Sequence, residues 1–332
     1  MNATTTIILC AAAAACAATA AETNGTAAAF PVRRVDDAVA ANWKGVVVVH
    51  AFLADWPEGD APDAKAVREW ILEMVSPARP VRSAVWSACP SDDWDSAKAA
   101  VRTRFFAQWT NDVLEDEWIT SPGEREEPSP FPESDGEVWI IGKWARVCAF
   151  DFASTRIVTF HACGSGQFET WPGSSWRTAA SFVRRDGRRI GWDAFADTNA
   201  VRAVIERALV EKFGDRANLY GDGIFIPDEL AFLANGFRCD YGDYSIGEPH
   251  YFSVHGEFPT CFVPYADVEE FLTDEAKELL LPHGGETIIE PSAGKESDRD
   301  LIDQTWSRAD AAVDAAAETN GTAEAGRKGN KP

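Results

Sequence analysis

The chain has 332 residues, of which 45% are hydrophobic, with 13 tryptophans and a formal net charge of −22. This apolar content supplies a core for one large or two modest domains and excludes disorder of the whole chain. The excess of 53 acidic over 31 basic residues argues against a nucleic-acid or anionic-membrane partner, because both need a basic footprint. It is compatible with a cationic partner, although acidity also simply keeps a protein soluble.

The first 20 residues have the pattern of a secretory signal peptide. An apolar, alanine-rich run over residues 7–18 leads into the small-residue cleavage pattern Ala18-Thr19-Ala20. No run in the sequence is long enough to be a transmembrane segment. We therefore expect export to the periplasm or the extracellular space, with cleavage before Ala21. The alternative is a lipoprotein anchored through Cys16.

Two nearly identical segments, residues 20–27 and 316–323, are small, polar and without aromatic side chains, which is typical of linkers. We predict a linker over residues 21–30. Residues 284–332 are predicted to be a mostly disordered acidic tail, apart from a short helix around residues 301–317. The folded regions are then residues 31–136 and 137–283.

Within residues 31–136, an apolar run over residues 44–49 predicts a buried strand. Residues 63–75 predict a helix whose apolar stripe consists of Val67, Trp70, Ile71 and Met74. A second helix begins after Ser91, and its predicted inward face consists of Val101, Phe105, Trp109 and Val113. The loop at 121–136, rich in Pro, Glu and Ser, is the best internal boundary.

Residues 137–283 alternate between strands and single helices. Strands are predicted at 137–144, 147–150, 157–162 and 179–184, followed by a turn at Asp186-Gly187. A helix capped by Thr198 ends at Gly214, and a β-meander over residues 226–265 leads to a capping helix that ends near residue 281. This order predicts an α+β fold with antiparallel sheets, not βαβ repeats.

Several short motifs in this region resemble a known family. The turn at Asp186-Gly187 leads through Asp193-Ala-Phe195 into a helix, and Tyr244-Ser-Ile246 is followed by Val263-Pro264-Tyr265. Residues 137–281 thereby resemble the C-terminal, extracytoplasmic domain of the RsiV anti-sigma factor and of PdaC-type deacetylases. One departure is the sequence at residues 170–175, where family members usually carry a Gly-Gly-Ala-His-like loop.

The resemblance implies a non-catalytic binding or sensing module of the cell envelope. Its expected ligand is a cationic protein such as lysozyme, or peptidoglycan. The alternative from a different class is a secreted hydrolase of cell-wall glycan. The deacetylase chemistry of PdaC-type proteins belongs to a separate metal-binding domain that this sequence does not contain.

Catalytic motifs do not support an enzyme. The sequence has no nucleophile elbow, no zinc-protease motif and no phosphate-binding glycine loop. His161 and Cys163 are two residues apart on a predicted strand, so they share a face as a nucleophilic pair could, but no third orienting group can be placed. We interpret them as structural. No catalytic residue, metal or cofactor is predicted, and no C-x2-C or H-x3-H spacing suggests zinc.

Loop aromatic residues are the candidates for ligand binding, since tyrosine and tryptophan on loops held by a rigid sheet make good anchors. The candidates are Trp171, Trp176, Tyr241, Tyr244 and Tyr251. Roles in packing compete with ligand contact at each of these positions.

Five cysteines remain after removal of the signal peptide, so at least one has no partner within the chain. Two pairs are placed to bridge: Cys239 with Cys261 on adjacent strands of the meander, and Cys148 with Cys163 on either side of a hairpin. Buried reduced cysteines remain the alternative for both pairs.

Overall fold

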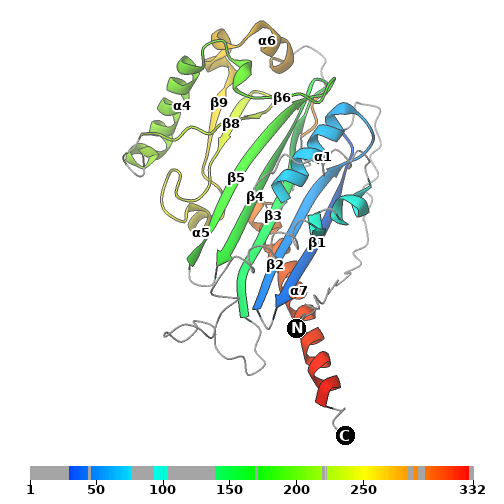
Figure 1. The fold of residues 1–332 in the computed structure, drawn as a ribbon. Helices are drawn as coiled ribbons and strands as arrows, with labels where there is room; N and C mark the ends of the chain where they lie inside the picture. Colours follow the sequence, from blue (N-terminus) through cyan, green and yellow to red (C-terminus); the bar gives the residue numbers. More distant parts are fainter. Residues whose placement is uncertain are drawn as a thin grey trace, which may run out of the picture.

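The computed structural model describes residues 30–43, 46–75, 93–99, 101–103, 139–168, 171–218, 221, 223–282, 287–290 and 296–328. Two β-sheets with packed helices confirm the predicted α+β class (Figure 1). The larger sheet consists, in spatial order, of β1 (Val32–Trp43), β2 (Val46–Pro57), β3 (Trp139–Ala153), β4 (Ile157–Phe168), β5 (Trp171–Val183) and β6 (Arg189–Ile190). The predicted signal peptide, Cys16, Cys89 and the boundary loop at 121–136 lie outside the described residues.

The larger sheet is mixed, because β2 and β3 run parallel while every other neighbouring pair is antiparallel. The predicted antiparallel pairing is therefore confirmed for the other neighbouring pairs described and does not extend to β2 and β3. Parallel neighbours need a long crossover connection, and here it includes helix α1 (Pro62–Val75). The pairing also places the two predicted regions, 31–136 and 137–283, in one sheet.

Strand lengths also differ from the predictions. The strands predicted at 137–144 and 147–150 form one strand, β3, whose pairing with β4 is irregular between Phe150 and Phe152. Strand β1 was not predicted because the charged residues 33–34 and 36–37 obscure its apolar alternation.

Helix α1 covers one face of the larger sheet, as its apolar stripe predicts. Val67, Trp70 and Ile71 are buried against sheet residues that include Phe160 and Phe182. Trp70 meets the Phe182 ring edge-to-face at a centroid distance of 6.3 Å. Residues 94–99 and 101–103 are helical as well, with Val101 in the same core, while residues 105, 109 and 113 lie outside the described residues.

The sheet caps the C-terminal end of α1. The Arg146 guanidinium donates to the carbonyl of Met74 at 2.8 Å, and Nε2 of His50 lies 2.5 Å from the carbonyl oxygen of Val75, to which it donates. Basic groups at this end satisfy carbonyls that have no partner within the helix. Burial, together with the charge of Arg146, lowers the pKa of His50 to about 3.

Helix α7 (Asp298–Lys328) packs on the opposite face of the sheet (Figure 1). The short helix predicted around residues 301–317 is part of α7, whereas the prediction of disorder is wrong for the rest of this helix. Its buried stripe is small and partly polar, which explains the weak signal in the sequence: Leu301, Ile302, Thr305, Ala309 and Ala312. Neither α7 nor any other helix in the described part of the chain is both long and apolar enough to cross a membrane.

The smaller sheet confirms the predicted meander. It consists of β7 (Ala231–Phe232), β8 (Gly236–Asp240) and β9 (Thr260–Pro264), all antiparallel. The helices of this part are α4 (Thr198–Phe213), α5 (Tyr251–His255) and α6 (Asp274–Leu280). Among the described residues, short 3-10 helices accompany them at Trp192–Ala194, Gly214–Asn218, Tyr265–Asp267 and Glu269–Phe271.

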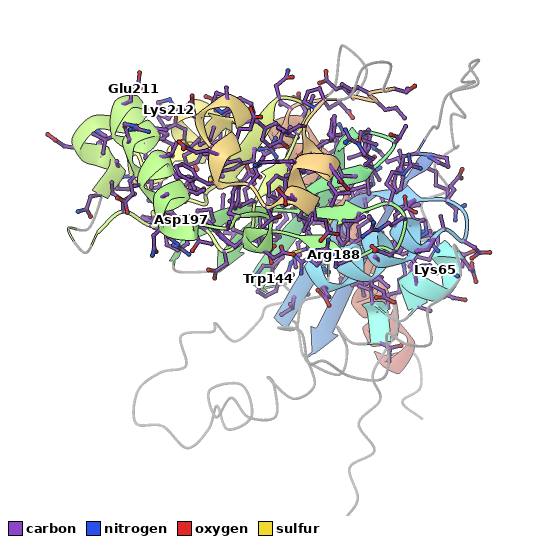
Figure 2. All side chains as sticks on the ribbon, turned by 90° about the horizontal axis from the view of Figure 1, so that it is seen from above. Lys65, Trp144, Arg188, Asp197, Glu211 and Lys212 are labelled. Atoms are coloured by element: carbon purple, nitrogen blue, oxygen red, sulfur yellow. The ribbon has the colours of Figure 1, made fainter. Side chains whose placement is uncertain are left out.

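The N-cap of helix α4 lies one residue before the predicted position. Asp197, not Thr198, is the N-cap, and its carboxylate accepts a hydrogen bond from the backbone N–H of Ala200 at 3.0 Å. In the view from above, Glu211 and Lys212 of α4 lie at the opposite end of the molecule from Lys65 of α1 (Figure 2). The core beneath α4 also contains residues of β7, β8, β9 and α6, which joins the smaller sheet to the end of the larger one.

Candidate functional site

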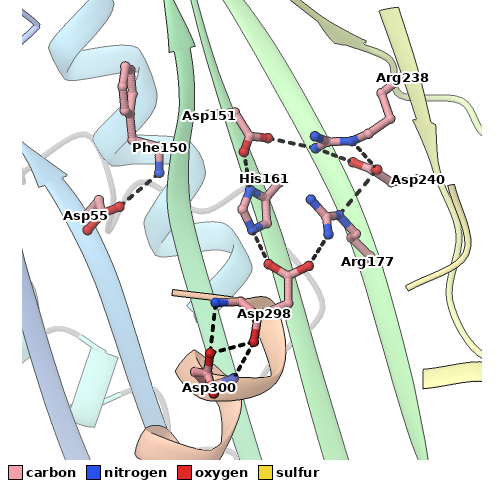
Figure 3. Close-up of polar contacts among 10 residues, drawn as sticks. Asp55, Phe150, Asp151, His161, Arg177, Arg238, Asp240, Asp298 and Asp300 are labelled. Carbon is pink, nitrogen blue, oxygen red and sulfur yellow. Dashed lines mark hydrogen bonds and ion pairs between the residues drawn. The ribbon is translucent and has the colours of Figure 1, made fainter. Parts of the chain in front are cut away.

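A buried histidine lies between two carboxylates where the larger sheet meets α7 (Figure 3). His161 on β4 is 1% exposed, its Nδ1 is 2.8 Å from Oδ1 of Asp151 on β3, and its Nε2 is 2.9 Å from Oδ1 of Asp298 in the first turn of α7. Ionised carboxylates only accept hydrogen bonds, so both ring nitrogens donate. The geometry therefore assigns His161 to the imidazolium form.

Two arginines complete the cluster around this histidine. Arg177 on β5 pairs with Asp298 and lies 3.3 Å from Asp240 on β8. Arg238, also on β8, contacts Asp151 at 2.7 Å and Asp240 at 2.5 Å. We call these six residues, Asp151, His161, Arg177, Arg238, Asp240 and Asp298, the buried charge cluster.

The charges in the buried charge cluster sum to zero, since three carboxylates face two guanidinium groups and one imidazolium. Burial by itself would raise the pKa of Asp298, but His161 and Arg177 outweigh it and hold that pKa below its ordinary value. Arg238 and Arg177 likewise outweigh burial at Asp240 and lower its pKa. Asp298 and Asp240 are thus ionised and neutralised in place.

The position of the buried charge cluster gives it a structural role. Its members come from both sheets and from α7, so it ties three layers together at one point. Asp240 is 2% exposed and Arg238 16%, which means that each charge depends on its protein partners more than on water. Breaking one ion pair would leave its partner buried without compensation.

Cys163 faces the same side of β4 as His161, as predicted from their spacing. The thiol is buried, and burial raises its pKa well above the ordinary value. His161 already donates from both nitrogens. In this arrangement the thiol is protonated and the imidazole cannot accept its proton, which supports the structural interpretation of the pair.

The predicted tryptophan sites are on β5. Trp171 is its first residue, and the side chain of Trp171 lies outside the described part of the structure. Trp176 is half-buried on the face that α1 covers, and its ring lies over Gly164 of β4: a Cβ at Gly164 would be 2.8 Å from the indole nitrogen. The Arg146 guanidinium is 5.9 Å from the centroid of the Trp176 ring.

The three predicted tyrosine sites differ in exposure. Tyr241 is 1% exposed within the core of the smaller sheet, and burial raises the pKa of its hydroxyl. This position argues against ligand contact. Tyr244 and Tyr251 are half-buried, and both lie on one surface segment, residues 244–256, which we call the tyrosine–histidine loop.

The tyrosine–histidine loop pairs each tyrosine with a histidine. The Tyr244 hydroxyl lies 3.0 Å from Nδ1 of His250, and the Tyr251 and His255 ring centroids are 4.2 Å apart. Val254, at 63% exposure, is the most exposed large hydrophobic residue among those described. The loop thus offers aromatic, imidazole and aliphatic groups together at the surface.

Two residues of the tyrosine–histidine loop have left-handed backbone conformations. Tyr244 has φ 65° and His250 has φ 59°, and these are the two non-glycine residues with positive φ in the described part of the chain. The segment is anchored by Asp243, whose carboxylate accepts from the backbone N–H of Phe252 at 2.9 Å and whose own N–H donates to the carbonyl of Ser175 at 2.8 Å. Such strain persists only where surrounding contacts hold it, and it concentrates at functional sites.

The four cysteines described by the structure are reduced and buried. Cys239 and Cys261 are direct cross-strand neighbours on β8 and β9, as predicted. Cys148 and Cys163 lie on adjacent strands but in cores on opposite faces of the larger sheet, so the second predicted bridge is incompatible with this arrangement.

Sequence reasoning found His161 but missed the other five residues of the buried charge cluster. A signal was present for two of them, because Arg238 and Asp240 flank Cys239 in an otherwise apolar strand. Asp298 could not have been found, since it is 137 residues from His161 and lies in a segment predicted to be disordered.

No protein-family model matches the chain, and no curated protein is significantly similar to it in sequence. Two solved structures, both described as DUF3298 family proteins, are similar to it. One, from Pseudomonas aeruginosa PAO1, is 14% identical, with 77% of this chain and 98% of that chain covered and a TM-score of 0.43. The other, from Bacteroides fragilis NCTC 9343, is 9% identical, with 73% and 94% covered and a TM-score of 0.45. DUF3298 is the RsiV/PdaC C-terminal-like domain.

Proposed function

We propose that the protein is an exported, non-catalytic binding module of the cell envelope that recognises a cationic protein of the lysozyme type or peptidoglycan. The observation that carries this proposal is the tyrosine–histidine loop, where half-exposed aromatic rings and the exposed Val254 are held by a strained backbone. Aromatic side chains held rigidly bind partners at low cost in conformational entropy.

Of these two ligands, the cationic protein is favoured by the net charge of −22. An acidic surface attracts a basic partner over a distance set by the Debye length, which is roughly 30 Å at 0.01 M salt and 8 Å at 0.15 M. Association with such a partner should therefore slow as salt rises. Peptidoglycan stacked on aromatic rings should bind with little dependence on salt.

The buried charge cluster supports a non-catalytic role. Its carboxylates are paired with arginine or histidine and are at most 12% exposed, so they do not present the open acid and base pair that a glycan hydrolase needs. These paired carboxylates therefore argue against the buried charge cluster as the site of a hydrolase.

The test measures binding of the exported chain to lysozyme and to insoluble peptidoglycan. Tyr244→Ala and Val254→Arg should each weaken binding at least tenfold. Val210→Arg is the matched control, because Val210 on α4 is 51% exposed and the same charge is added outside the loop. Circular dichroism of each variant checks that it remains folded.

Three results would count against the proposal. Binding to neither ligand at low salt removes its basis, and equal binding by the Val254→Arg and Val210→Arg variants removes the loop as the site. Release of soluble sugar fragments from peptidoglycan would instead support the hydrolase alternative.

A further inference from the structure

Three potential metal-binding side chains converge between β4 and the first turn of α7. His161, Cys163 and Asp298 each offer one ligand atom, and these atoms all lie within 4.8 Å of one another. Imidazole nitrogen, thiolate sulfur and carboxylate oxygen are the donors that zinc uses in proteins. We propose that these three residues bind a divalent cation of the zinc type.

The spacing of the three ligand atoms is close to that of a metal site. Donors around a tetrahedral zinc ion, at about 2.0 to 2.3 Å from the metal, are roughly 3.3 to 3.8 Å apart. The widest separation here is at most 4.8 Å, so a move inward of about 1 Å brings the donors to an ion. Three protein ligands leave a fourth position for water.

The histidine is already oriented as a metal ligand. Nδ1 of His161 is 2.8 Å from the carboxylate of Asp151, while Nε2 faces Asp298. Metal-binding histidines commonly donate their second N–H to a carboxylate in this way, which fixes the ring and makes the ligating nitrogen more basic. Asp151 would keep this contact when Nε2 turns from Asp298 to the ion.

The charge balance allows the exchange of protons for a metal. Without metal, three carboxylates are matched by two guanidinium groups and the imidazolium of His161. With a divalent cation bound, the Nε2 proton of His161 and the thiol proton of Cys163 pass to solvent. Three carboxylates and one thiolate then face two guanidinium groups and the ion, and the sum is again zero.

Burial of Cys163 explains why the site needs the metal to ionise its thiol. Cys163 is fully buried, so water does not stabilise a thiolate there. A cation at the sulfur supplies the opposite charge that is missing there. Asp298, with its side chain 12% exposed, is the most exposed of the three proposed ligands.

The test uses cobalt as a spectroscopic substitute for zinc in the metal-stripped, reduced full chain. We expect one Co²⁺ per chain, a thiolate-to-cobalt band in the near ultraviolet, and loss of the band when Zn²⁺ is added. Cys163→Ser should abolish the band. Cys148→Ser is the matched control, since Cys148 is equally buried on the adjacent strand but faces the other side of the sheet.

Two further variants keep the result decisive if Cys163→Ser does not fold. Asp298→Asn should keep the band and weaken affinity at least tenfold, and Asp151→Asn should weaken it 10- to 100-fold through the orientation of His161. A wild-type chain that shows no thiolate band, or a band that survives in Cys163→Ser, overturns the proposal. Val254→Arg should leave the band unchanged, so this site fails or holds independently of ligand binding at the loop.

Discussion

Replacing Arg238 by methionine tests whether the buried charge cluster holds the two sheets together. The guanidinium spans Asp151 at 2.7 Å and Asp240 at 2.5 Å, and its side chain is 16% exposed. Methionine retains most of the apolar volume and removes the charge, so the cluster changes from neutral to a net charge of −1.

The expected loss in the free energy of unfolding follows from the carboxylates that lose their partner. Removing one partner of a buried ion pair costs about 3 to 5 kcal/mol, because the other charge stays buried without compensation. The slight exposure of Arg238, and the continued presence of Arg177 near Asp240, favour the lower end. We expect a loss of about 3 kcal/mol in the free energy of unfolding at pH 7.

This loss should depend on pH with a definite sign. In the wild type, Arg238 and Arg177 outweigh burial and lower the pKa of Asp240. Without Arg238, burial raises that pKa relative to the wild type. The penalty is then present at neutral pH and shrinks as pH falls and the carboxylate of the variant becomes protonated.

Urea denaturation of wild type and variant at pH 7 and pH 4.5 measures both effects. Arg185→Met is the matched control, since Arg185 is 66% exposed and pairs with Asp186 and Glu275 at the surface. The control should lose less than about 1 kcal/mol. Equal losses for the two variants, or a loss for Arg238→Met that does not change with pH, would refute the reasoning.

Three other predictions follow from the structure and the sequence. The pKa of His50 is about 3 in the folded protein and 6.5 in the unfolded chain. The free energy of unfolding should therefore decrease as pH falls from 6.5 to 3, by at most about 5 kcal/mol. His50→Leu should remove this part of the acid sensitivity, as measured by urea denaturation. Mild oxidation should form a disulfide between Cys239 and Cys261 and raise the melting temperature. The reason is that directly opposed residues on antiparallel strands have Cα atoms about 4.5 to 5.5 Å apart, which a disulfide can span. Peptide mapping that finds both thiols still reduced would contradict this prediction. Mass spectrometry should place the mature N-terminus at or near Ala21, whereas a diacylglyceryl mass on Cys16 would support the lipoprotein alternative.

Local patterns in the sequence predicted the elements whose apolar residues repeat strongly. Helix α1 has four large apolar residues at helical spacing, so its position and its inward face could be predicted together. The meander was predictable because Gly236 and short apolar runs define its turns and strands. Helix α7 was predicted only in part, as a short helix around residues 301–317, because it buries mostly alanine and threonine below Leu301 and Ile302, and side chains this small give little periodic signal.

The composition of the buried charge cluster was decided by the tertiary structure alone. A charged residue in a sequence is normally at the surface, and nothing local distinguishes Asp151 or Arg177 from a solvated side chain. Only the pairing of β3, β4 and β5, with β8 on one side and α7 on the other, places those charges around His161. The sequence by itself determined that His161 and Cys163 share one face of β4, because strand periodicity is local. The tertiary structure decided their partners, because these come from distant segments of the chain: Asp298 is 137 residues away from His161.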